Sequence, residues 1–307
     1  MGNPQGKPVS LTRFAWLSIG AAVVTIVLKM TAYLITSSVG LLSDALESTV
    51  NLAAAIVALI VLRIVLKPES DEFSYGYSKA EYFSTGFEGG MILLAAVGII
   101  VSAIPRLIDP VPLEQVGLGL IISVIASLIN LGVALVLMRA GKKYGSITLQ
   151  ADSRHLMTDV WTTGGVLVGI ALVGITGYQR LDPIIALLVA ANIVFTGYKM
   201  LVHAGKGLLD TSLPPEEIKE VKSILEAYQA QGVGYHALRS RQAAARKFLV
   251  IHLLVPGSWT VKQGHELAEQ IEIKVTKAIP QVSMTTHIEP SEDPLAQTDI
   301  YLDRVVQ

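Results

Sequence analysis

The sequence predicts an α-helical membrane bundle of six spans followed by a small α+β domain. Apolar residues make up 51% of the 307 residues and charged residues only 16%, below the roughly 25% charged content of ordinary soluble domains. The mean hydropathy of +0.53 agrees with this. After Leu209 the composition changes abruptly to a charged, soluble-looking stretch. We therefore expect a membrane domain over residues 1–209 and a second domain over residues 210–307.

Six apolar segments are long enough to span a membrane, since a span needs about 20 mostly apolar residues. The first dozen residues are polar and lack the features of a signal peptide, so the first segment is expected to be a retained span. The predicted spans are Phe14–Thr36, Leu41–Val65, Ser84–Ile108, Val116–Met138, Leu156–Ile175 and Pro183–Val202.

Lysine and arginine are distributed unequally between the two sides of this bundle. One side carries most of them, including Lys7, Lys67, Lys142 and Lys143, whereas the other offers Arg106 and Arg180. Because positive residues accumulate in cytoplasmic loops, we expect a multi-pass protein of the cell (inner) membrane, in contact with lipid, with both termini in the cytoplasm.

The stretch after the last span alternates helix and strand patterns. A helix is expected from about Ser212 to Gln231, where glycines follow, and a second after Thr260, with Gln263 completing a capping box. Strands are expected at Tyr235–Gln242, Lys247–Val255 and Val282–Glu289. The order αββαβ predicts a cytoplasmic ferredoxin-like domain.

Charge and cysteine content limit the partners and the metal chemistry. The net charge of −1 provides no basic excess to neutralise phosphates, so nucleic acid is not expected as a partner. The chain has no cysteine. Any metal must therefore be held by imidazole, carboxylate, hydroxyl or carbonyl groups, with no thiolate.

Polar residues in two spans predict a metal site inside the membrane. His155 and Asp159 are four residues apart, which places them on one side of a helix. Asp44 has Ser48 one turn and Asn51 two turns further along its helix. Such groups persist in a membrane mainly where they face one another or water. We expect Asp44, His155 and Asp159 to bind a divalent cation, with either Ser48 or Asn51 supplying or positioning a fourth ligand.

Other interpretations stay open for these and for neighbouring polar groups. His155 and Asp159 could instead bond to each other or lie at the membrane interface. Lys29 could snorkel or pair with a carboxylate. Glu47, Glu88 and Asn130 could orient ligands or have purely structural roles.

In combination, these motifs resemble the cation diffusion facilitator family over nearly the whole chain. The resemblance rests on the SVGLLSD entry to the second span, the stretch Tyr75–Glu81 (YGYSKAE), HxxxD in the fifth span and the αββαβ domain. It implies a homodimer that exports divalent metal from the cytoplasm in exchange for protons, without an enzymatic activity or a prosthetic group. Familiar members carry two Asp residues, or a His and an Asp, four residues apart in the second span, and in this chain the second of these positions is Ser48.

The resemblance also implies a regulatory metal site in the cytoplasmic domain, which contains four of the six histidines. His287 and Glu289 are two residues apart on one strand and can point together. Structural roles remain possible for individual histidines. The expected ligands are His236, His252, His265, His287 and Glu289.

Zinc is the expected cargo, because imidazole and carboxylate suit it, although iron, manganese, cobalt, nickel and cadmium accept similar ligands. Metal binding needs deprotonated ligands, so protons and metal should compete, which predicts antiport. Two rival functions remain at this point. One is a membrane metal sensor or receptor, and the other is an intramembrane metalloenzyme, although the HExxH motif of zinc proteases is missing.

Overall fold

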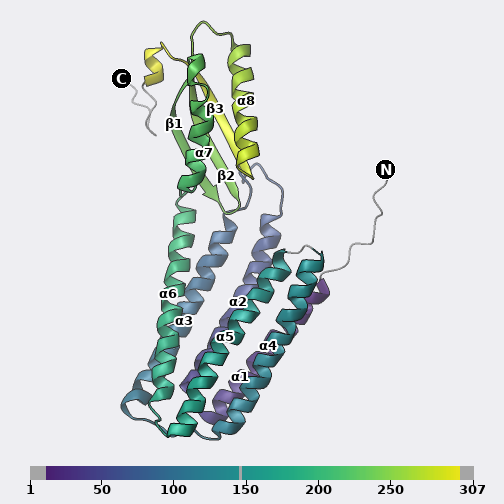
Figure 1. The fold of residues 1–307 in the computed structure, drawn as a ribbon, viewed down its shortest axis with the longest axis vertical. Coiled ribbons are helices and arrows are strands. Elements are labelled where there is room, and N and C mark those ends of the chain that lie inside the picture. The colour runs from purple at the N-terminus through teal and green to yellow at the C-terminus, as the bar shows by residue number, and fades with distance from the viewer. Residues whose placement is uncertain (1–11, 145–146, 298–307) are drawn as a thin grey trace, which may run out of the picture. The chain divides into compact units, whose positions relative to one another are not determined.

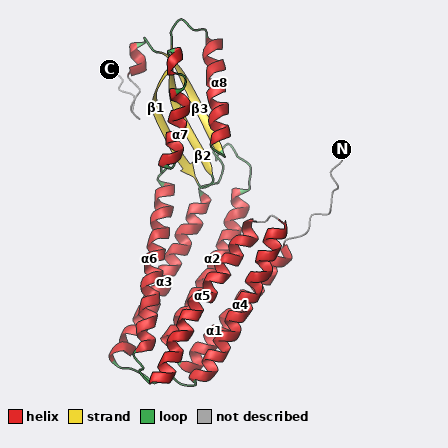
Figure 2. Cartoon of the chain, in the orientation of Figure 1, coloured by secondary structure: helices red, strands yellow, loops and turns green. Residues whose placement is uncertain are grey.

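The computed structural model describes residues 12–144 and 147–297. Within them, six long helices precede an α/β domain, and strands occur only in that domain (Figure 2). All six helices are long and apolar enough to cross a membrane, as predicted. The helices are α1 (Thr12–Thr36), α2 (Val39–Val65), α3 (Ala80–Ile108), α4 (Val116–Tyr144), α5 (Ile147–Thr176) and α6 (Leu181–Leu208) (Figure 1).

Several helices extend further than the predicted spans. α5 begins at Ile147, whereas its apolar run was predicted from Leu156, and α4 continues to Tyr144. The apolar pattern marks only the part suited to lipid, and helical hydrogen bonding continues past it. His155 therefore lies eight residues, about 12 Å, inside α5.

By their internal contacts the residues form two compact units. One comprises the chain up to Ile60 together with Ser84–Leu201, and the other comprises Val61–Phe83 with Val202 onwards. In the second unit Lys79 Nζ lies 2.9 Å from Asp210 Oδ1, and Arg241 Nη1 lies 3.4 Å from the same atom. Partial burial alone would raise the pKa of Asp210, but these two cations outweigh it and lower that pKa below its usual value.

Small residues allow close helix packing in the first unit. α3 and α6 approach so closely that a Cβ on Gly89 would lie 3.1 Å from the carbonyl oxygen of Gly197. Alanines contribute the fully buried positions of the same contact, among them Ala96, Ala103 and Ala190. Membrane helices associate through close packing of this kind, because lipid supplies no hydrophobic drive.

A buried carboxylate fixes the start of α2. Asp182, at the start of α6 and 1% exposed, accepts hydrogen bonds from Ser38 Oγ (2.5 Å) and from the backbone N–H groups of Val39 (2.7 Å) and Gly40 (3.1 Å). These are among the N–H groups that a helix start leaves without intrahelical partners. Arg106 also donates to the carbonyl of Ser37 at 2.6 Å. α2, which carries Asp44, is thus held in place by groups from α3 and α6.

The domain that follows has the predicted αββαβ order. Its elements are α7 (Pro215–Glu226), β1 (Gly234–Ala243), β2 (Arg246–Val255), α8 (Val261–Ala278) and β3 (Val282–Pro290). β2 is central, antiparallel to β1 and parallel to β3. The predicted capping box of Thr260 and Gln263 is present at the start of α8.

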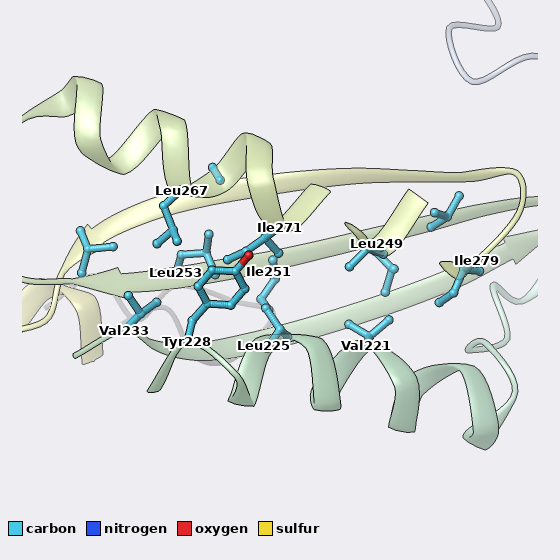
Figure 3. Packing of buried hydrophobic residues seen from close by; sticks show 14 of the residues in the cluster. Val221, Leu225, Tyr228, Val233, Leu249, Ile251, Leu253, Leu267, Ile271 and Ile279 are labelled. Carbon is cyan, nitrogen blue, oxygen red and sulfur yellow. The ribbon is translucent and has the colours of Figure 1, made fainter. Parts of the chain in front are cut away.

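The two helices of this domain cover one face of the sheet. Alternate residues of β2, Leu249, Ile251 and Leu253, pack with Val221 of α7 and Ile271 of α8 (Figure 3). The period of two in a strand leaves the intervening residues on the opposite face. His252 is one of these, so the strand alternation that builds the core also places a histidine on the face without helices.

Candidate metal centres

Polar side chains connect α2 and α5 at two levels. Thr163 Oγ1 donates to Asp44 Oδ1 at 2.8 Å, and Asn51 Nδ2 donates to Asp159 Oδ1 at 3.2 Å. The helices therefore lie side by side, as expected, and run antiparallel, because the higher-numbered residue of α2 faces the lower-numbered residue of α5. Asp44 faces the turn after Asp159 and is offset from Asp159 itself.

A lysine from α1 occupies the Asp44 level. Lys29 Nζ donates to Asp44 Oδ1 and to Ser48 Oγ, both at 2.8 Å, and Lys29 and Asp44 are only 1% and 3% exposed. Of the two roles left open for Lys29, the structure shows pairing with a carboxylate. Two of the five predicted ligands, Asp44 and Ser48, are thus contacted by an ammonium group.

Ser48 and the other three predicted ligands, Asn51, His155 and Asp159, line a small cavity. Its volume is about 60 Å³, which exceeds the roughly 10 to 15 Å³ that one water needs. The polar residues that line it are Ser18, Thr25, Ser48, Asn51, Asn130, Asp152, His155 and Asp159. Asp159 is buried, whereas His155 is exposed. Imidazole, carboxylate and amide groups around a polar cavity can coordinate a divalent cation.

Sequence reasoning missed some of these residues. Asp152 precedes His155 by three residues, a spacing that places both on one helix face and could have identified it. Thr163 follows Asp159 by one turn and could have been found in the same way.

Two acids whose roles the sequence left open lie near the site. Glu47 is close enough to Asp44, Asp159 and Lys29 for their charges to interact, and Glu88 is close enough to His155.

A second set of ligands is assembled on the face of the sheet opposite α7 and α8. His236, His252 and Glu289 offer donor atoms that all lie within 4.8 Å of one another. His236 Nε2 lies 3.0 Å from Glu289 Oε2, and His252 Nδ1 lies 3.2 Å from Glu289 Oε1. His287 Nε2 is also 3.2 Å from Glu289 Oε1, but its side chain is 63% exposed.

Strand register produces this cluster. His236 pairs with His252 across β1 and β2, and His252 pairs with His287 across β2 and β3, so the three imidazoles form a row. A β-bulge follows His236, where Ala237 has a φ of 49°. Bulges re-aim neighbouring side chains and are typical of functional sites.

The structure does not bring His265 into this row. His265 is exposed on α8, which packs against the opposite face of the sheet. The expectation that it joins the other four residues arose from the resemblance and not from strand register. Within the described part of one chain, the cluster consists of His236, His252, His287 and Glu289.

The donor spacing of the cluster fits zinc. Two ligands of a tetrahedral zinc, each about 2.0 to 2.1 Å from the ion, lie roughly 3.3 Å apart. The observed separations of 3.0 to 3.2 Å are close to this value. Three imidazoles and one carboxylate offer four possible ligands without cysteine. Three of them, His236, His252 and Glu289, are already close together, and the exposed side chain of His287 would have to turn toward them to join the set.

Comparisons with known proteins agree with both parts of the chain. Residues 15–209 match the cation efflux transmembrane domain, and residues 213–291 match the cation efflux protein cytoplasmic domain. An uncharacterized transporter of Synechocystis, sll1263, is 51% identical over 92% of this chain and 91% of its own length. The cation-efflux pump FieF of Klebsiella pneumoniae is 30% identical, over 95% of this chain and 96% of its own.

Among solved structures, the metal-bound C-terminal domain of the CzcD transporter from Thermotoga maritima is similar. It is 25% identical, with a TM-score of 0.24, and the match covers 26% of this chain and 92% of that one. The family models cover the membrane and the cytoplasmic domains separately, and together they include every proposed ligand. The chain therefore belongs to the cation diffusion facilitator family and is a multi-pass cation efflux transporter.

Proposed function

We propose that this transporter exports divalent metal cations from the cytoplasm in exchange for protons, with zinc as the best-fitting cargo. The observation that carries the proposal is the cavity among α1, α2, α4 and α5, which Asn51, His155 and Asp159 all line and where Asn51 contacts Asp159. An imidazole and a carboxylate without a thiolate suit zinc, and also the related divalent ions iron, manganese, cobalt, nickel and cadmium.

Proton exchange follows from the same ligands. A carboxylate or imidazole must be deprotonated to bind metal, so metal arriving from one side displaces protons, and protons arriving from the other side release metal. Asp44, one turn from the cavity-lining Ser48 on α2, completes the proposed transport site with Ser48, Asn51, His155 and Asp159.

The cytoplasmic cluster is proposed to regulate transport. His236, His252, His287 and Glu289 would bind zinc when the metal is abundant, and they lie on the face of the sheet that α7 and α8 leave uncovered. We propose that two copies of the chain pair through this domain, with both termini in the cytoplasm. Bound zinc would then favour the conformation to which it binds more tightly.

Metal movement into sealed vesicles tests the transport proposal. The full chain is reconstituted into liposomes that contain a zinc-sensitive dye. It should take up zinc faster when the lumen is more acidic than the outside, because protons then leave as zinc enters. A panel of divalent ions at two pH values would rank the cargoes. Zinc uptake equal to that of protein-free liposomes would refute transport of zinc, and uptake without counterflow of protons would refute antiport.

A further inference from the structure

The only fully buried lysine among the described residues contacts the membrane acid Asp44. Lys29 is seven residues from the end of α1, about 10 Å along the helix axis, and it points into the protein. Its ammonium donates hydrogen bonds of 2.8 Å to Asp44 Oδ1 and of 2.8 Å to Ser48 Oγ. The function proposed above assigns no role to this lysine.

The oxygens that Lys29 contacts are proposed metal ligands. Asp44 Oδ1 accepts from both Lys29 and Thr163, whereas Asp44 Oδ2 is buried without a hydrogen-bond partner among the described residues. Buried polar atoms are normally partnered. The carboxylate is therefore neutralised on one oxygen and retains unused capacity on the other.

An ammonium and a divalent ion cannot share this position. An ion bound to Asp44 would lie within a few ångströms of the lysine nitrogen, and like charges at that distance repel strongly away from bulk water. Without any cation, however, Asp44 would be a buried and unpaired charge, which is unfavourable in a membrane. Lys29 supplies the positive charge while the metal is absent.

We propose that Lys29 is a tethered competitor of the cargo. It occupies Asp44 and Ser48 while the transport site is empty, and it must leave both before a divalent cation can bind there. This inference rests on the proposed function, because it concerns the same ligands. As a consequence, the apparent metal affinity equals the intrinsic affinity multiplied by the fraction of molecules in which Lys29 has left Asp44, and is therefore lower. Weaker binding favours release of the cargo after each transport step.

The alternative is that the ion pair only holds α1 against α2. The two roles predict opposite signs. Removal of a competitor strengthens metal binding, whereas removal of a purely structural contact leaves binding unchanged or weakens it. Lys29→Met removes the charge and keeps a side chain of similar length. Lys29→Gln also removes the charge but keeps a hydrogen-bond donor for Asp44.

Zinc titration of the full chain in lipid nanodiscs distinguishes these roles. Every protein carries His252→Ala and Glu289→Gln, so that binding at the cytoplasmic cluster does not contribute. Lys29→Met is expected to bind zinc at least tenfold more tightly than this parent protein. Lys199→Met is the matched control, because Lys199 is an exposed lysine of α6 that lies over the Phe195 ring. The control should bind zinc as the parent does.

Each outcome bears on the proposal. Equal or weaker zinc binding by folded Lys29→Met, or by folded Lys29→Gln where the methionine variant does not fold, overturns it. Neutral variants that do not fold without zinc should fold when zinc is present during purification, because the ion then supplies the charge opposite Asp44, and failure of both to fold with zinc as well would overturn the proposal. A parent that binds zinc without a gain in Lys29→Met refutes the competitor alone. A parent that neither binds nor transports zinc refutes the proposed function as well.

Discussion

The proposed membrane site and the cytoplasmic cluster both offer imidazole and carboxylate groups, but in different arrangements. In the cluster, donor atoms of His236, His252 and Glu289 already lie within 4.8 Å of one another. In the membrane, Asp44 is held by Lys29 and Thr163, and Asp159 accepts a hydrogen bond from Asn51. In the cluster the candidate ligands contact one another, whereas in the membrane a lysine ammonium, which cannot be a ligand, contacts the acid Asp44.

This difference corresponds to what each site is proposed to do. A regulatory site only has to respond to metal concentration, so prearranged ligands on a rigid sheet are suitable. A transport site has to release its ion on every cycle, and ligands with alternative partners within the protein make release less costly. Experiments that separate the two sites can therefore break or sharpen the comparison.

The largest effect is expected from Asp159→Asn in the membrane site. The substitution keeps the shape of the side chain but removes the buried charge next to the cavity. Zinc uptake into proteoliposomes should fall by about a hundredfold or more, because loss of a charged ligand and its proton removes the basis of exchange. Zinc binding at the cytoplasmic cluster should be unchanged.

Asp109→Asn provides the matched control for this variant. It makes the same chemical change at an exposed position after α3, and it should transport zinc at the parental rate. Uptake by Asp159→Asn within a few-fold of the parent would show that the acid of the HxxxD motif is not needed, and the membrane site would have to be placed elsewhere.

The contrast between the sites also explains what the sequence could predict. Six apolar runs and the strand alternation of FLVIHLLV were sufficient for both domains, because burial of apolar surface dominates each. Helical spacing also predicted that His155 and Asp159 share a face. The partner of Asp44 could not be assigned in this way, since Lys29 lies on another helix and helix rotation is decided by packing.

Substitution of Glu289 by glutamine is the next largest test and concerns the cytoplasmic cluster. The Glu289 carboxylate lies 3.0 to 3.2 Å from all three imidazoles, so the change removes the single negative charge that a zinc ion would meet there. Zinc affinity of the cluster, measured in an Asp159→Asn background, should fall at least tenfold. Glu272→Gln makes the same change on α8, where Glu272 accepts from Thr286, and should leave the affinity unaltered. An unchanged affinity in Glu289→Gln would exclude this carboxylate as a ligand.

Asp182→Ala should have a smaller effect, confined to the membrane unit. Three donors, Ser38 Oγ and the N–H groups of Val39 and Gly40, would lose their acceptor at a buried helix start. Such losses amount to about 1 to 3 kcal/mol. The unfolding midpoint of the membrane unit in a denaturing detergent should decrease, with zinc binding at the cluster unchanged. Asp182→Asn keeps one acceptor oxygen, so its unfolding midpoint should lie between those of the parent and of Asp182→Ala. Equal midpoints for all three proteins would show that this cap does not hold α2.

His265→Ala is expected to have the smallest effect and tests the boundary of the cluster. The resemblance to the family implied that His265 is a ligand, but the residue is exposed on α8, and the cluster lies on the other face of the sheet. Zinc affinity of the cluster in the Asp159→Asn background should therefore change by less than twofold, whereas His252→Ala should reduce it at least tenfold. A loss in His265→Ala comparable to that in His252→Ala would mean that a ligand reaches the zinc from outside this row of strands. Since the row already supplies three imidazoles and a carboxylate from β1, β2 and β3, the geometry of a single chain favours the smaller change.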